Sequence, residues 1–63
     1  ADSGELAALV QQVVDANPAK VAEYRAGKKN LLGMFMGDLM KLTKGKADPK
    51  LSNQLLRDKL EQA

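Results

Sequence analysis

The residues best suited to chemistry in this 63-residue chain are lysines and arginines gathered in its middle. Residues 20–50 contain eight Lys or Arg against three Asp or Glu, whereas the whole chain has a net charge of only +2. Such a concentration of positive charge suits a polyanion, because ammonium and guanidinium groups neutralise phosphates and release their counterions. The same composition is found on solvated surfaces that keep small domains soluble. Charge alone therefore leaves both interpretations open.

Residue types used in catalysis and metal binding are scarce. The chain has no cysteine and no histidine, which excludes zinc ribbons, disulfide frameworks, thiol nucleophiles and histidine-based triads. Its eight carboxylates are scattered, without the spacing of an acid–base pair or a metal site. Residues 45–50 (GKADPK) lack the spacing of a phosphate-binding P-loop. We therefore expect a binding protein, with no catalytic residue, no metal site and no cofactor in this chain.

A short turn carries the most specific local signal. Residues 43–46 (TKGK) offer a hydroxyl, two ammonium groups and backbone N–H groups, which together can hold phosphates. An ordinary helix end, with lysines favouring the helix dipole, has the same sequence. The turn joins two stripes of helix surface, Asn30–Lys44 and Lys50–Arg57, so one continuous binding face is plausible. Its predicted members are Arg25, Lys28, Lys29, Lys41, Lys44, Lys46, Lys50, Asn53 and Arg57.

Helical periodicity dominates the chain, and no pattern typical of strands is visible. Apolar residues within 6–14 recur at the spacing of one helix face. Asn17, followed by proline, ends this first helix and caps a short second one, which stops at Gly27. A fourth helix is expected over residues 49–61, with Asp48 as its cap.

The third helix is expected over residues 28–44, with Gly45 as its stop, and is apolar around roughly two-thirds of its circumference. Such a helix needs contacts from several sides, so we expect it at the centre of an all-α bundle of three to four short helices. Gly33 and Gly37 lie on its remaining arc. They allow close packing of another helix, which we favour, or the approach of a phosphate backbone. Asp38 falls within the apolar arc and has no evident partner.

The chain is short enough for one domain at most, residues 1–63. It begins with alanine, so we expect a piece of a longer protein. No apolar run approaches the length of a membrane span, and the lack of cysteine is compatible with a cytoplasmic location.

Several segments of residues 17–60 together form one recognisable pattern. They are Asn17-Pro18, Tyr24–Lys28, Leu32-Gly33, Gly37, Met40-Lys41, Thr43–Ala47, Pro49 and Asn53–Leu60. With these segments, residues 17–60 resemble the C-terminal tail of the B subunit of the aspartyl/glutamyl-tRNA amidotransferases, a domain shared with free-standing YqeY-type proteins. The sequence departs from the family pattern at residues 34–36 and at Asp38.

This resemblance implies a role in tRNA binding. The family enzyme converts Glu-tRNA(Gln) or Asp-tRNA(Asn) to the amidated form. It takes ammonia from its A subunit, while ATP and Mg²⁺ act in the body of its B subunit. The tail contacts the outer corner of the tRNA. The chain would then be a non-catalytic, cytoplasmic domain that docks tRNA through its lysine-rich face. Its other partners would be the catalytic body of the B subunit, together with the A and C subunits, with no membrane.

Two alternatives remain open. The apolar third helix could dock on a neighbouring protein, which would make the chain an interaction or scaffold module. The chain could also be a free-standing YqeY-type protein. Salt separates RNA docking from apolar docking, because only the former weakens steeply as the salt concentration rises.

Overall fold

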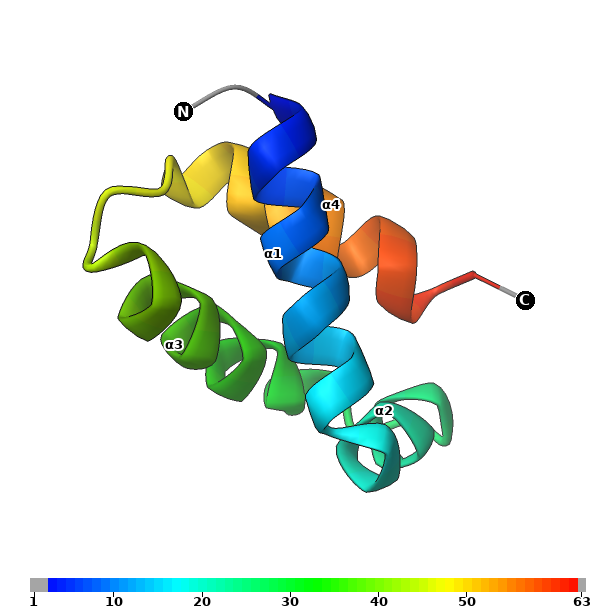
Figure 1. Ribbon diagram of the computed structural model, residues 1–63. Helices are drawn as coiled ribbons and strands as arrows, with labels where there is room; N and C mark the ends of the chain where they lie inside the picture. The colour runs from blue at the N-terminus through cyan, green and yellow to red at the C-terminus, as the bar shows by residue number, and fades with distance from the viewer. Residues whose placement is uncertain (1–2, 63) are drawn as a thin grey trace.

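The computed structural model describes residues 3–62, with only the backbone of Ser3, so the ends of the predicted 1–63 domain lie outside it. Within this range there are helices and no strands, which confirms the predicted all-α fold. α1 contacts both α4 and α3, and α2 lies at one end of the bundle (Figure 1). None of the described helices is long and apolar enough to cross a membrane. The elements are α1 (Ser3–Ala16), α2 (Pro18–Arg25), the 3₁₀ turn η1 (Lys29–Leu31), α3 (Leu32–Thr43) and α4 (Pro49–Leu60).

The core lies where α1, α3 and α4 meet, since each of these helices contacts the other two. α2 closes one end of the core with two side chains. Burial of these apolar side chains is the main favourable contribution to folding in a domain of this size. The buried apolar residues are Leu6, Val10 and Val13 of α1, Val21 and Tyr24 of α2, Phe35 and Leu39 of α3, and Leu56 and Leu60 of α4.

The third helix starts later than the sequence predicts, at Leu32 and not near residue 28. The N–H groups of Gly27 and Lys28 donate to the carbonyls of Tyr24 and Glu23, both at 3.0 Å. This is a Schellman ending of α2, and Gly27 takes the left-handed conformation it requires, with φ 126°. The chain must leave this turn before a new helix can begin, and it does so through η1.

α3 contacts both α1 and α4, but it is not covered on every side. Phe35 and Leu39 are fully buried, whereas its three methionines are half-buried and Leu42 is 44% exposed. Gly33 and Gly37 are exposed, and a Cβ added at either position would meet no atom within 4 Å. The interpretation that these glycines allow close helix packing is therefore wrong for the described part of the chain. Part of the apolar surface of α3 remains uncovered.

Asn17 occupies the predicted cap position of α2, but its side chain makes no cap hydrogen bond. Its amide nitrogen instead donates to the carbonyl of Val13 at 2.8 Å and to the carboxylate of Asp38 at 3.4 Å. The side chain therefore closes the last turn of α1 and reaches across to α3. Asp38 thereby gains the partner that the sequence did not show.

Candidate nucleic-acid interface

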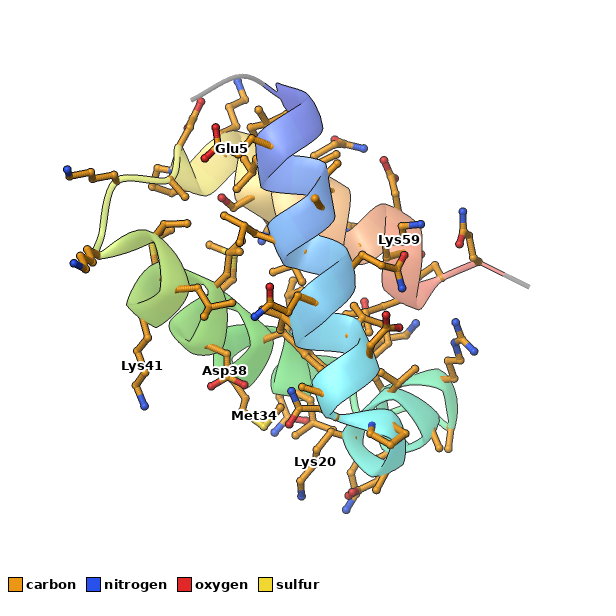
Figure 2. All side chains as sticks on the ribbon, viewed as in Figure 1. Glu5, Lys20, Met34, Asp38, Lys41 and Lys59 are labelled. Carbon is orange, nitrogen blue, oxygen red and sulfur yellow. The ribbon has the colours of Figure 1, made fainter. Side chains whose placement is uncertain are left out.

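The predicted binding residues fall into two groups at different ends of the bundle. One group lies where α2 ends near the last turn of α4, and the other surrounds the connection between α3 and α4, at the left of Figure 1. Figure 2 shows Lys41 of the second group projecting outward from α3. Asn53 lies between them on α4 and is half-buried. We call Arg25, Lys28, Lys29 and Arg57 the engaged bases, and Lys41, Lys44, Lys46 and Lys50 the free lysines.

Arg25 closes the end of α4. Its Nε donates to the carbonyl of Leu60 at 2.9 Å and its Nη2 donates to the carbonyl of Lys59 at 3.4 Å. The last carbonyls of a helix have no partners within the helix, and they form the negative end of its dipole, so a guanidinium group satisfies both needs. Arg25 therefore holds α2 against α4. Its acceptors lie 35 and 34 residues away in the sequence, so no local pattern reveals this role.

A cluster around Glu61 engages two more bases. The buried Tyr24 donates its hydroxyl to Glu61 Oε2 at 2.9 Å, and Arg57 Nε lies 3.7 Å from the same oxygen. Lys29 Nζ lies 4.4 Å from the centre of the Tyr24 ring, within the range of a cation–π contact. The hydrogen bond from Tyr24 holds the pKa of Glu61 below its ordinary value. Burial, followed by the hydrogen bond to Glu61, raises the pKa of Tyr24.

Lys28 is engaged less firmly. Its Nζ lies 3.2 Å from Glu23 Oε1, and Lys20 Nζ lies 3.4 Å from the other oxygen of the same carboxylate. The two ammonium groups, with Lys28 the larger influence, lower the pKa of Glu23. Both pairs are exposed to solvent, where ion pairs contribute little and exchange readily with other ions.

The free lysines have no such partners. All four side chains are exposed, and within residues 3–62 none of them forms an ion pair or a side-chain hydrogen bond. They belong to the last turn of α3, the connecting turn and the first turn of α4. The fold therefore presents four ammonium groups around one turn, each free to pair with an external anion.

The turn that connects α3 and α4 has fewer free hydrogen-bond donors than the sequence indicated. The backbone N–H groups of residues 44–46 donate to the carbonyls of Lys41, Met40 and Thr43, at 3.3, 2.8 and 3.1 Å. The Thr43 hydroxyl donates to the carbonyl of Leu39 at 3.1 Å. These N–H groups and this hydroxyl already have acceptors within the chain and complete the end of α3, so they are not free to donate to a phosphate. Only the ammonium groups remain for an anion.

Lys44 stands in a left-handed conformation, with φ 55° and ψ 38°. Gly45, which the sequence indicated as the stop of the helix, follows it with φ 77°. The left-handed residue that stops α3 is therefore a lysine, one residue before the predicted glycine.

The N-terminus of α4 is occupied by the protein's own carboxylate. Asp48 Oδ1 accepts a hydrogen bond from the backbone N–H of Lys50 at 3.0 Å, which confirms the predicted cap. A helix N-terminus can bind an external phosphate through its N–H groups and dipole. Because Asp48 already supplies a negative charge here, anion binding near α4 depends on the lysine side chains.

An apolar hollow adjoins the free lysines. A cavity of about 360 Å³ opens between α1, the end of α3 and the start of α4, with Leu6, Leu9, Leu42 and Leu51 among its lining residues and Lys46 beside them. A second hollow of about 280 Å³, between α1 and α3, is also lined by Leu42. No pattern in the sequence indicated either hollow, because each is formed by residues of distant segments. Among the described residues, Leu42 is the large apolar side chain left exposed.

Within residues 3–62, no group of three potential metal ligands comes together. The described carboxylates instead serve caps and pairs, as Asp48 and Glu61 do.

Comparison with known proteins identifies the family. The chain matches the GatB domain over residues 1–60. It belongs to the GatB domain family. This GatB domain is 58% identical over 59 residues to the B subunit of the aspartyl/glutamyl-tRNA(Asn/Gln) amidotransferase of a Picosynechococcus species, covering 94% of the chain and 12% of that protein. No solved structure gives a significant match.

Other relatives carry the same name. The protein from Chlorobium chlorochromatii is 55% identical over 60 residues, and the one from Caldanaerobacter subterraneus is 52% identical over 60 residues. Each match covers 95% of this GatB domain and 13% of the relative. The resemblance to the amidotransferase B subunit is thus confirmed, and the chain spans about one-eighth of the length of the relatives it matches.

Proposed function

We propose that this GatB domain docks tRNA for an amidotransferase B subunit, using the free lysines to hold the phosphate backbone. The observation that carries the proposal is the set of four exposed lysines around one turn, none of them paired within residues 3–62. The relatives are amidotransferase subunits whose name specifies tRNA. A folded RNA presents closely spaced phosphates, which suits a cluster of ammonium groups.

The docking is electrostatic and depends on shape. Tyr24 and Phe35 are the only aromatic residues of the chain, and both are buried, so they are not available for base stacking. Lysines contact phosphates as point charges and carry no sequence information by themselves. Binding by this domain alone is therefore weak, and linkage to a catalytic body that holds the same tRNA strengthens it.

The domain is a non-catalytic part of a cytoplasmic enzyme in this proposal. ATP and Mg²⁺ belong to the rest of the B subunit, while the A and C subunits complete the assembly. Arg25, Lys29 and Arg57 support the fold, because their charged groups already have partners in the chain. Lys28 pairs with Glu23 and Asn53 is half-buried, so neither belongs to the docking surface in this proposal.

A salt titration of tRNA binding tests the proposal, with the domain joined to the rest of its subunit. With four phosphate contacts, the logarithm of the association constant should fall by about 3–4 for each tenfold rise in salt concentration, and this value is the salt slope. The double substitution Lys44→Ala with Lys46→Ala should flatten this slope by about 1.4–1.8. The matched control is Lys20→Ala with Lys28→Ala, which removes the same charge at the other end of the bundle and should leave the slope unchanged.

A second candidate function rests on the exposed Leu42 and the hollows that it lines. Docking of another protein segment there would be driven by apolar burial and would change little with salt. A slope unaffected by the lysine substitutions, together with loss of assembly in Leu42→Ser, would reject the tRNA proposal in favour of this one.

A further inference from the structure

We infer that Lys44, which occupies a backbone position that favours glycine, strengthens the binding of RNA and lowers the stability of the domain. The inference rests on the proposed function and names one residue within it. It predicts that removing the Lys44 side chain makes the domain more stable and its binding weaker.

Two Schellman endings within residues 3–62 have the same pattern of hydrogen bonds but different residues at the left-handed position. At the end of α2, the N–H groups of Gly27 and Lys28 donate to the carbonyls three and five residues earlier. At the end of α3, the N–H groups of Lys44 and Gly45 do the same, at 3.3 and 2.8 Å. Gly27 and Lys44 therefore occupy equivalent positions, and both have positive φ.

This position favours glycine for a physical reason. In the left-handed conformation, the Cβ of an L-residue crowds the neighbouring carbonyl oxygen, and glycine has no Cβ. Asparagine tolerates the conformation better than most residues, whereas a long unbranched side chain has no such advantage. Replacement of Lys44 by glycine would leave all three backbone hydrogen bonds of the turn in place.

Nothing in the described part of the chain compensates for this cost. Lys44 is exposed and makes no ion pair or side-chain hydrogen bond within residues 3–62. Its charge does favour the negative end of the α3 dipole, but Lys41 and Lys46 supply the same charge on either side of it. The fold alone therefore gives no reason for a lysine at this place.

Binding of an external phosphate to the Lys44 ammonium group would explain why a lysine stands at this position. The backbone from residue 44 to residue 46 is fixed by its three hydrogen bonds, so an ammonium group there is carried by a segment that is already ordered. A phosphate that binds to it does not have to order the chain, and less conformational entropy is lost on binding. An external polyanion is the partner that this exposed cation lacks.

Three substitutions separate charge from backbone, all made in the complete subunit. Lys44→Gly and Lys44→Asn remove the charge and suit the conformation, whereas Lys44→Arg keeps the charge. Hydrogen exchange of α3 amides should slow by about two- to fivefold in Lys44→Gly. The affinity for tRNA at about 0.15 M salt should fall about four- to sixfold in the glycine and asparagine variants, with the salt slope reduced by about 0.7–0.9. Lys44→Arg should restore the affinity and the slope.

The controls distinguish this inference from the proposed function. Lys46→Ala removes a neighbouring charge without changing a left-handed residue, so its affinity should fall while exchange stays unchanged. Faster exchange in Lys44→Gly would show that the lysine serves the helix dipole, and the inference would be overturned. Wild-type affinity in the glycine and asparagine variants, with weakened binding in Lys46→Ala, would also overturn it and leave the proposed function standing. Unchanged binding in every lysine variant would reject both.

Discussion

The two ends of this small bundle carry the same number of predicted binding bases, but they use them differently. Where α2 meets the end of α4, four bases lie against helix carbonyls, carboxylates and a tyrosine ring. Around the connection between α3 and α4, four lysines have no partner within residues 3–62. A base that looks like a binding residue in the sequence can therefore be a structural residue in the fold.

The supply of acceptors explains the difference. The α2–α4 end contains Glu23, Glu61 and the last carbonyls of α4, all within reach of a base. At the other end, the carboxylate of Asp48 is used to cap α4, and that of Asp38 accepts from Asn17. The turn after α3 satisfies its own carbonyls with backbone N–H groups. Within residues 3–62 the free lysines form no ion pair with any of these groups, so their charge faces solvent.

The largest expected effect on stability comes from a substitution in the core, which both ends of the bundle share. Leu39 is fully buried, as the sequence predicted, and Leu39→Ala should lower the free energy of unfolding by about 2–5 kcal/mol. The loss should affect both ends alike, as measured by chemical denaturation and by hydrogen exchange in α2 and in α3. Exchange that accelerates only in α3 would mean that the two ends are stabilised independently.

A smaller loss of stability, without a change in the salt slope, should distinguish the engaged bases from the free lysines. Arg25→Ala removes a charged donor from the last turn of α4 and should cost about 1–2 kcal/mol of stability, with the salt slope of tRNA binding unchanged. Arg25→Lys keeps the charge but lacks the two N–H donors that reach both carbonyls, so it should recover only part of the stability. The difference between the two ends would disappear if Arg25→Ala flattened the salt slope as much as Lys44→Ala.

The smallest expected effect is a pH dependence confined to the α2–α4 end. The pKa of Glu61 is lowered from 4.5 by the Tyr24 hydroxyl. A lowered carboxyl pKa contributes stability above its unfolded value, and this contribution is lost as the pH falls through the folded value. The structure should therefore loosen below about pH 4.5, and Tyr24→Phe should reduce this acid sensitivity.

A titration of stability between about pH 3 and pH 6, compared for wild type and Tyr24→Phe, measures this effect. Glu61→Gln is the matched control, because it removes the titrating group and keeps a hydrogen-bond acceptor. The same acid sensitivity in all three proteins would assign it to other carboxylates.

Local features of the fold were predictable from the sequence. The Asp48 cap, the Gly27 stop and the burial of Tyr24 each depend on residues close together in the chain or on one helix face, and the structure confirms them. The partners of the Asn17 and Arg25 side chains were not predictable in the same way, because they lie 21 and 35 residues away. Helical periodicity gives the direction of a side chain but not the identity of its distant neighbour.

The candidate site was predictable only as a set of charges. The sequence placed the free lysines around one turn, but it could not show which of the predicted bases had partners. It also assigned the helix stop to Gly45, because glycine is the usual left-handed residue after a helix, and so it missed the left-handed Lys44. Conformations at single positions depend on the hydrogen bonds of the whole turn.

The open space beside Gly33 and Gly37 makes α3 convenient for labelling. The chain contains no cysteine, so a cysteine introduced at either position would be unique within it. Since an added Cβ there meets no atom within 4 Å, a thiol could carry a fluorophore or a crosslinker without displacing the core. Replacing a glycine within a helix also removes a backbone entropy cost, so the label should not weaken the helix. Gly37 precedes Lys41 by about one helical turn, which places such a reporter beside the free lysines.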